Sequence, residues 1–303
     1  MGNKPSPSDP VRFAIIGGSG LYALAGLEDT REISVETPFG PPSDAILVGS
    51  LAGRPVAFLA RHGRHHKLLP TEVNYRANIY ALKSLGVERI FSASAVGSMR
   101  ETIHPRDVVL VDQFIDRTRQ RPSTFFGGGL AAHVAFADPV CPVVRARMLD
   151  AARRLGAGVH ESGTYLCIEG PAFSSRAEST LYRSWDVDVI GMTNLPEARL
   201  AREAEICYAT LALVTDYDCW HEEEEDVSVA ALLDNLKANS ALAAGVVREA
   251  IAALPERRAG ECACGDALRH GLITAREAIS EETVRRLKPI LHKYFGPADR
   301  PVS

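Results

Sequence analysis

Strand-like runs recur along this sequence, and several of them are apolar at successive positions instead of alternate ones. The runs lie at residues 12–18, 55–61, 89–97, 107–114, 188–193 and 206–215. A strand shows this pattern when both of its faces are buried, as in a sheet that helices cover on each side. Helix-like patterns fall between the runs, at residues 74–85, 142–155, 176–184, 196–204 and 228–252. The sequence therefore predicts an α/β domain with a central mixed, largely parallel sheet flanked by helices.

The length and composition of the chain suit one large domain. It has 303 residues, of which 46% are hydrophobic and 24% are charged, an ordinary globular composition. We expect a disordered tail at residues 1–10 and a main domain at 11–253. A stretch rich in Pro, Arg and Gly, "LPERRAGECACGD", then separates this domain from a C-terminal extension with short helices, residues 254–303.

Charge and hydropathy argue against two classes of partner. The 34 basic and 38 acidic residues give a net charge of −4, and the basic residues are scattered instead of forming a stripe. We therefore predict no nucleic-acid partner. No apolar run approaches the roughly 18 residues of a membrane span, and the start of the chain lacks the apolar core of a signal peptide. We predict no membrane partner and a cytoplasmic location.

The six cysteines are Cys141, Cys167, Cys207, Cys219, Cys262 and Cys264. Only the last two are close in sequence, and no C-x-x-C pair exists, so this spacing predicts no structural zinc. Cys141 and Cys207 belong to separate elements and are better placed for a long-range bridge. A reducing cytoplasm opposes such a bridge, and we expect mostly free thiols.

Small polar and basic residues follow the predicted strands, where open α/β sheets bind ligands. The turns are "GGSG" with Ser19, "RHGRHH" with Arg61 and His62, "SASAVGS" with Ser94, and "GMTNLPE" with Thr193. Glycine amides, hydroxyls and a guanidinium are donors that phosphate accepts. Together they predict a phosphate cradle. A tight turn at Ser19 and a solvated basic loop at the histidines are the plainer alternatives, and no metal site is predicted.

Two aspartates, Asp216 and Asp218, end the run at 206–215 in "LALVTDYDCWHEEEE". In an extended segment, residues two apart face the same way, so both carboxylates can reach one ligand. Like charges so close raise the pKa of one of them, which suits a proton donor. The alternative is an Asp-rich turn that caps a helix.

Eight segments carry a resemblance to a known family. They are "IIGGSGL", "TPFGPPSDAILVG", "ARHGRHH", "VNYRANIYALK", "DQFIDRT", "IEGPAFSSRAES", "GMTNLPEARLAREA" and "VTDYDCW". With these segments in this order, the chain resembles the 5′-methylthioadenosine phosphorylases of the trimeric purine nucleoside phosphorylase superfamily. The resemblance covers about residues 12–250 and implies a nucleoside phosphorylase-like fold. It implies phosphorolysis of S-methyl-5′-thioadenosine to adenine and 5-methylthioribose 1-phosphate, in methionine salvage.

The resemblance also implies residue roles. Asp216 would donate to purine N7, and Asp218 would accept from the 6-amino group. The residues implied for phosphate are Ser19, Arg61, His62, Ser94, Thr193 and the backbone of Ala95. Those implied for the nucleoside are Met192 at the ribose, Phe173 and Ser174 at the base, Val229 at the 5′ substituent, Leu233 as a further substrate-binding residue, and His133 from a neighbouring subunit of a homotrimer. Met192 as core filler stays an alternative, and Gly191, where some members have Asn, receives no role.

Inorganic phosphate is a co-substrate, and the resemblance implies no cofactor. A broader purine nucleoside phosphorylase, a nucleosidase and a non-catalytic nucleoside-binding protein remain alternatives. The C-x-C at Cys262 and Cys264 resembles one that joins disulfides in heat-stable relatives, but here we expect it to be reduced. The acidic run 221–226 is expected to be a solvated lid segment and not a metal site.

Overall fold

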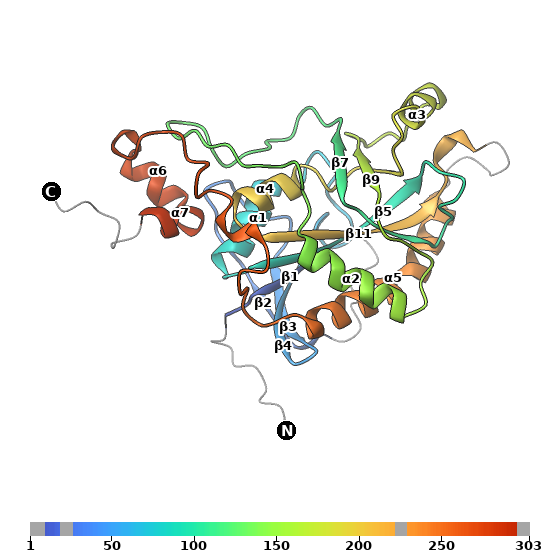
Figure 1. Cartoon of the computed structure of the whole chain (residues 1–303), viewed down its shortest axis with the longest axis horizontal. Coiled ribbons are helices and arrows are strands. Elements are labelled where there is room, and N and C mark those ends of the chain that lie inside the picture. The colour runs from blue at the N-terminus through green and yellow to red at the C-terminus, as the bar shows by residue number, and fades with distance from the viewer. Residues whose placement is uncertain (1–9, 19–26, 222–228, 296–303) are drawn as a thin grey trace.

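The computed structural model describes residues 10–18, 27–221 and 229–295 (Figure 1). Its strands and helices alternate along most of the chain. The strands are β1 (Phe13–Gly17), β2 (Glu28–Ile33), β3 (Ile46–Leu51), β4 (Arg54–Ala60), β5 (Arg89–Ser98), β6 (Val108–Leu110), β7 (Gln113–Asp116), β8 (Val159–His160), β9 (Thr164–Cys167), β10 (Val189–Gly191) and β11 (Cys207–Asp216). The α-helices are α1 (Tyr75–Ser84), α2 (Pro142–Arg154), α3 (Arg176–Arg183), α4 (Glu197–Glu203), α5 (Val229–Ala253), α6 (Glu281–Arg286) and α7 (Lys288–Phe295). Short 3-10 turns are η1 (Asp218–Trp220), η2 (Ala263–Asp266) and η3 (Arg276–Ala278).

All the described strands belong to one mixed sheet. Its main path runs β2-β3-β4-β1-β5-β10-β9-β7, and β11 pairs with β5 and β6 off that path. The central strands β4, β1, β5 and β11 pair in parallel, whereas β2–β3, β3–β4, β5–β10 and β6–β11 are antiparallel. The prediction of a single α/β domain with a mixed, largely parallel sheet is confirmed.

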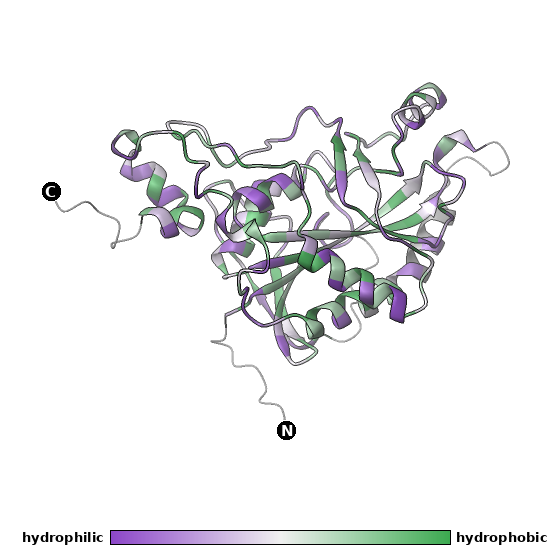
Figure 2. Ribbon diagram, in the orientation of Figure 1, coloured by the Kyte–Doolittle hydropathy of each residue, from purple (hydrophilic) through white to green (hydrophobic). Residues whose placement is uncertain are grey.

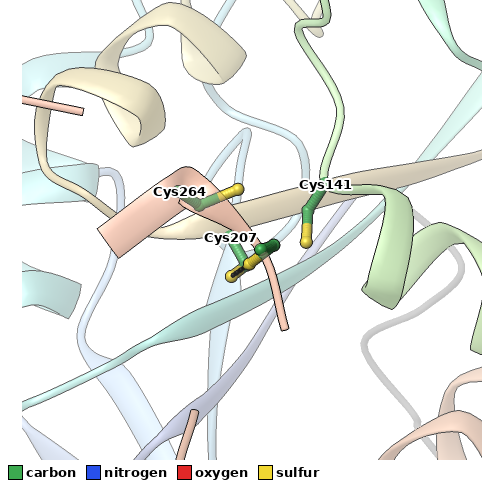
Figure 3. Close-up of side chains that lie close together, drawn as sticks. Cys141, Cys207 and Cys264 are labelled. Atoms are coloured by element: carbon green, nitrogen blue, oxygen red, sulfur yellow. Dashed lines mark hydrogen bonds between the residues drawn. The ribbon is translucent and has the colours of Figure 1, made fainter. Parts of the chain in front are cut away.

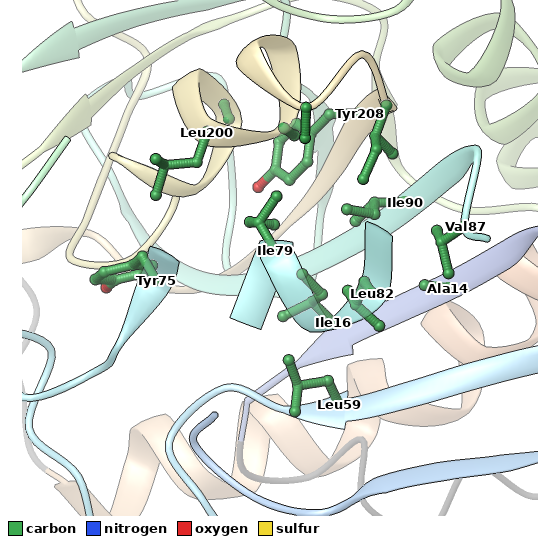
Figure 4. Packing of buried hydrophobic residues seen from close by; sticks show 14 of the residues in the cluster. Ala14, Ile16, Leu59, Tyr75, Ile79, Leu82, Val87, Ile90, Leu200 and Tyr208 are labelled. Carbon is green, nitrogen blue, oxygen red and sulfur yellow. The ribbon is translucent and has the colours of Figure 1, made fainter. Parts of the chain in front are cut away.

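Both faces of the central sheet are buried, which explains the unbroken apolar runs. In β1, Phe13 and Ile15 face the layer formed by α2 and α5, whereas Ala14 and Ile16 face the layer formed by α1 and α4. Figure 4 shows the second layer, where Ile79 and Leu82 of α1 pack over the sheet. In Figure 2 the long strands β5 and β11 carry apolar colour along much of their length. Helices on both faces therefore protect the strands that carry the site.

Some predicted elements differ from the structure. The run at 107–114 is divided into β6 and β7, which pair with different neighbours, β11 and β9. The sequence prediction missed β2, whose residues are mostly exposed and polar, because such an edge strand has no apolar signal. It also missed β3, β8 and β9. The extension holds short helices as predicted, α6 and α7, and α7 packs against α1.

Among the described helices, none combines the length and the apolar character that crossing a membrane requires.

Candidate functional site

A cavity of about 530 Å³ opens at the carboxyl ends of β1, β4 and β11, with the second half of β5 as its floor. This is where ligands bind in open α/β sheets. The structure brings most of the predicted site residues to its wall. They are Arg61, His62, Ser94, Ala95, Phe173, Ser174, Met192, Thr193, Asp216 and Asp218. Gly18, His66, Leu69 and Ile190 are among the lining residues that the sequence did not single out.

Arg61 forms a buried ion pair that the sequence reasoning did not foresee. Its Nε and Nη2 donate to the two carboxylate oxygens of Glu197 at 2.8 and 2.9 Å, and both side chains are 1% exposed. Further bonds run to the carbonyl of Ala93 and the hydroxyl of Ser92. Within the described part of the chain, these contacts use four of the five guanidinium N–H groups, so one N–H on Nη1 remains for a ligand. Burial alone would lower the pKa of Arg61, but the charge of Glu197 raises it, and the guanidinium stays charged.

His62 is held as a neutral imidazole. Its Nδ1 lies 2.9 Å from the carbonyl oxygen of Leu68, which can only accept, so Nδ1 carries the proton. Burial, followed by the neighbouring charge of Arg61, lowers the pKa of His62 to about 4. The ring stacks on His66 with centroids 4.5 Å apart. At neutral pH, Nε2 is therefore an acceptor at the wall of the cavity.

Three hydroxyl groups meet beside these residues. Ser94 Oγ lies 2.8 Å from Thr193 Oγ1 and 3.4 Å from the phenol oxygen of Tyr165. The backbone N–H of Thr193 donates to the same phenol at 3.3 Å. Each hydroxyl can turn its hydrogen towards an anion, so the group provides adjustable donors. Tyr165 is a member that the sequence prediction missed.

Tyr165 also explains the glycine at position 191. A Cβ on Gly191 would lie 2.1 Å from the phenol oxygen, far inside van der Waals contact. The phenol thus occupies the space that a side chain at 191 would need. Gly191 directly precedes Met192 and Thr193. The space at this position is therefore set by Tyr165 on the neighbouring strand β9.

Both aspartates line the cavity, but not through strand alternation. β11 carries an irregularity between Val214 and Asp216, and the chain turns immediately afterwards into η1, with Asp218 at a φ of 52°. Asp216 Oδ1 accepts from the backbone N–H of Asp218 at 2.9 Å, and Oδ2 lies 2.7 Å from the hydroxyl of Thr215. A bulge that re-aims a side chain is common beside active sites. Both carboxylates do line one cavity, as expected. The reason given, that residues two apart in a strand face the same way, was wrong, because Asp218 lies in η1.

Asp218 is buried, and its Oδ2 accepts from Ser179 Oγ at 2.6 Å. Burial is the main cause that raises its pKa, and the charge of Asp216 adds to the rise. Gly97 makes room for the pair, since a Cβ there would lie 2.9 Å from Asp216 Oδ1. The raised pKa thus falls on Asp218, whereas the resemblance implied the donor role for Asp216. The two carboxylates on this wall of the cavity differ in environment, and such a difference can separate acid and acceptor roles.

Nearby groups suit a flat aromatic ligand. Phe173 is a large side chain left 48% exposed at the cavity. Ser174 Oγ is buried and has no hydrogen-bond partner among the described residues, an unmet demand that a polar edge of a ligand can satisfy. Arg121, which the sequence did not identify, donates to the carbonyls of Met192 and Leu195, each at 2.7 Å, and so fixes the backbone beside the ligand.

Four predicted positions are not placed at the cavity. Ser19 lies outside the described residues, as do the side chains of Val229 and Leu233 at the start of α5 and most of the acidic run 221–226. His133 is exposed and does not line the cavity, and its backbone N–H donates to the carbonyl of Gly271 at 2.8 Å.

Away from the cavity, four of the cysteines come together, a proximity that their sequence spacing did not indicate. All six cysteines are described and are free thiols. The sulfurs of Cys141, Cys207, Cys262 and Cys264 nevertheless lie within 4.8 Å of one another. Sequence spacing could not find this cluster because folding brings its members together from three separate regions.

The chain is similar to known proteins over most of its length. The Phosphorylase superfamily matches residues 12–252. The S-methyl-5′-thioadenosine phosphorylase of Geobacter sulfurreducens is 58% identical, over 93% of this chain and 98% of that protein. The enzyme of that name from Koribacter versatilis is 56% identical, over 94% and 97%.

Solved structures of the same name are also similar. A methylthioadenosine phosphorylase from an antarctic soil metagenomic library has a TM-score of 0.86 and 51% identity, over 93% of this chain and 100% of that one. The Schistosoma mansoni enzyme in complex with adenine has a TM-score of 0.82 and 34% identity, over 88% and 99%. The chain therefore belongs to the phosphorylase superfamily and, within it, to the family of the S-methyl-5′-thioadenosine phosphorylases.

Proposed function

We propose that this protein catalyses the phosphorolysis of S-methyl-5′-thioadenosine and releases adenine and 5-methylthioribose 1-phosphate. One observation carries the proposal: a single cavity joins a hydroxyl cluster beside a buried arginine to a pair of carboxylates in different environments. Gly97 is the partner of Asp216 in the sheet. Ser94 lies three residues before Gly97 on β5, and three residues of a strand span about 10 Å. That separation leaves room for a ribose between a phosphate and a purine.

In this reaction a phosphate oxygen attacks C1′ from the face opposite the base. The C1′–N9 bond breaks through an oxocarbenium-like state, and its electron pair passes to the purine. In its proposed role Asp216 carries a proton and donates it, or a hydrogen bond, to N7, which stabilises charge as it develops. Asp218 accepts from the 6-amino group, where a 6-oxo group would leave two acceptors facing each other.

At the other end, we assign phosphate to Ser19, Ser94, Thr193, the Ala95 backbone, the free N–H of Arg61 and His62. A neutral His62 has an acceptor at Nε2, so it suits hydrogen phosphate, whose O–H can donate to it. Met192 would pack on the ribose and Phe173 on the base. Val229 and Leu233 are assigned to the pocket of the 5′ substituent. No cofactor or metal takes part in this scheme, and we place the enzyme in the cytoplasm, with the catalytic domain at residues 11–253.

The decisive experiment is turnover of methylthioadenosine with and without inorganic phosphate, with products separated by chromatography. We expect adenine and 5-methylthioribose 1-phosphate only when phosphate is present. Equal turnover without phosphate, with free methylthioribose as product, would identify a nucleosidase. Equal kcat/KM for inosine would favour a broader purine nucleoside phosphorylase, and no turnover with intact ligand binding would leave a binding protein.

We also propose a homotrimer in which His133 completes the 5′ pocket of an adjacent subunit. The exposure of His133 away from the cavity of its own chain supports this assignment. Light scattering should give three chains per particle, and His133→Ala should raise KM for methylthioadenosine. The matched control is His270→Ala, an exposed histidine of the neighbouring segment. A fully active monomer would overturn the proposal.

A further inference from the structure

Four cysteine sulfurs meet on the side of the molecule opposite the carboxylate pair. Cys141 precedes α2 as its N-cap, Cys207 is the first residue of β11, and Cys262 and Cys264 come from the extension around η2. Figure 3 shows Cys141, Cys207 and Cys264 lying close together although they come from three separate segments. The four sulfurs are within 4.8 Å of one another, and those of Cys207 and Cys262 are 3.4 Å apart.

The backbone holds two of these residues firmly. The N–H of Cys141 donates to the carbonyl of Tyr208 at 2.8 Å, and that of Cys207 donates to the carbonyl of Glu88 at 2.9 Å. Cys141, Cys207 and Cys264 are buried, and Cys262 is partly buried. Backbone bonds of the core therefore fix the positions of Cys141 and Cys207, and the extension brings Cys262 and Cys264 to them.

We propose that Cys141, Cys207, Cys262 and Cys264 bind a structural zinc ion. Tetrahedral zinc bonded to four sulfurs at about 2.3 Å places those sulfurs about 3.8 Å from one another. The observed separations match this requirement with little adjustment. Four soft thiolates with no histidine or carboxylate in the group select zinc over the hard cations magnesium and calcium.

Disulfides explain the cluster less well. A bond between Cys262 and Cys264 would close a very small loop and carry strain. Two bonds could pair all four sulfurs, but the sulfurs of Cys207 and Cys262 lie 3.4 Å apart, well beyond the roughly 2.05 Å of a disulfide bond. The observation to be explained is four mutually close sulfurs, and a four-coordinate ion accounts for all of them at once.

The surroundings compensate for the charge of the site. Four thiolates and one Zn²⁺ carry a net charge of −2. Nη1 of Arg258 donates to Cys207 Sγ at 3.7 Å, and the N-terminus of the 13-residue helix α2 lies at Cys141. Gly265 leaves the space for Arg258, since a Cβ there would lie 2.2 Å from its guanidinium. Such outer groups orient and stabilise thiolate ligands.

This ion would serve structure and not catalysis. Four protein ligands leave no open position for a substrate. Cys207 and Asp216 stand at opposite ends of β11, roughly 30 Å apart for a strand of this length. The ion would tie the extension to the core at α2 and β11, and on binding the thiols release their protons to solvent.

The test begins with the full chain, expressed with zinc present and purified anaerobically without chelator. Metal analysis should find about one zinc per chain, in addition to any carried by an affinity tag. Replacement by cobalt should give the visible absorption of tetrahedral cobalt bound to four thiolates. A chelator added to the unfolded protein should release the metal. Four thiols that do not react in the metal-bound protein should then react with a thiol reagent. Metal-free protein, or iron as the bound metal, would overturn the assignment, as would disulfides found by mass spectrometry of the anaerobic sample.

Variants supply the second arm of the test. Cys207→Ser and Cys264→Ser should each lose zinc and lower the midpoint of thermal unfolding by at least about 5 °C. Turnover of methylthioadenosine at low temperature should change less than about twofold, because the site is far from the cavity. Cys219→Ser, which lies outside the cluster, is the matched control and should keep the zinc. If a variant does not fold, cobalt titration of the wild-type chain decides alone, and failure to bind cobalt refutes the proposal.

Discussion

Arg61 and Glu197 are joined at two points, at 2.8 and 2.9 Å, at the base of the cavity. Glu197 also accepts from Ser92 and Tyr208, at 3.1 and 2.8 Å, so the carboxylate ties the arginine to β5 and β11. The pair therefore does more than neutralise a charge. It fixes the orientation of the guanidinium and decides which single N–H can face a ligand.

The first prediction concerns Glu197→Gln. This change leaves the buried guanidinium without its charged partner, and we expect the free energy of unfolding to fall by about 3–5 kcal/mol. Because Glu197 positions Arg61, KM for phosphate should rise more than KM for the nucleoside. Urea denaturation and steady-state kinetics measure the two effects. Glu32→Gln breaks a solvent-exposed pair with Arg64 and should leave the free energy of unfolding nearly unchanged. Equal small losses in both variants would contradict the prediction.

The second prediction concerns Asp216→Asn. In the proposed role of Asp216, its hydrogen bond to N7 strengthens only as the base leaves, so the loss of this bond should lower kcat far more than it raises KM. We expect kcat to fall on the order of 10²-fold or more. Rapid measurement of adenine release gives kcat. Asp150→Asn, on the outer face of α2, should behave like the wild type. Near-normal kcat in Asp216→Asn would make Asp216 a structural residue only.

Asp218→Asn tests the choice of purine. Asparagine tolerates the positive φ of this position better than most residues, so the backbone should keep its turn. The amide can donate to a 6-oxo group, and the ratio of kcat/KM for adenine over hypoxanthine nucleosides should fall on the order of tenfold or more. Competition between methylthioadenosine and methylthioinosine measures the ratio directly. An unchanged ratio would remove Asp218 from the specificity role.

Much of the fold could be read from the sequence because both-face burial gives the central strands an unbroken apolar pattern. The edge strand β2 could not be predicted from the sequence, because its six mostly exposed residues give no hydrophobic signal. In the same way, polar residues at the strand ends were predicted to meet, and Arg61, His62, Ser94 and Thr193 line one cavity. The pair of Arg61 with Glu197 joins residues 136 positions apart, and no local pattern predicts such a contact. The cysteine cluster was missed for the same reason.

The pH dependence of stability should reveal His62. Its pKa is about 4 in the folded chain, below the ordinary value, so the unfolded chain takes up the proton first. Stability contributed by this residue is therefore complete above about pH 6.5 and is lost as the pH falls towards 4. Between about pH 8 and about pH 5, the wild type should lose about 2 kcal/mol more than His62→Gln. Denaturation in phosphate-free buffer measures this, with the exposed His292→Gln as control. Parallel pH profiles for the wild type and His62→Gln would refute it.

The last prediction tests the coupling of Gly191 to Tyr165. Gly191→Ala places a methyl group on the phenol oxygen and should destabilise the protein by roughly 1–3 kcal/mol. It should also lower kcat/KM, because Met192 and Thr193 follow directly in the chain. Tyr165→Met removes the ring and lets a flexible side chain fill the space, so Gly191→Ala should cost less in that background. A double-mutant cycle by urea denaturation measures the coupling.

The control is Gly245→Ala. Gly245 lies within helix α5, and a methyl group there meets only the flexible end of Leu155, so this change should leave stability unchanged or raise it by up to about 1 kcal/mol. Additive effects of the changes at 165 and 191 would show that the phenol does not exclude a side chain there.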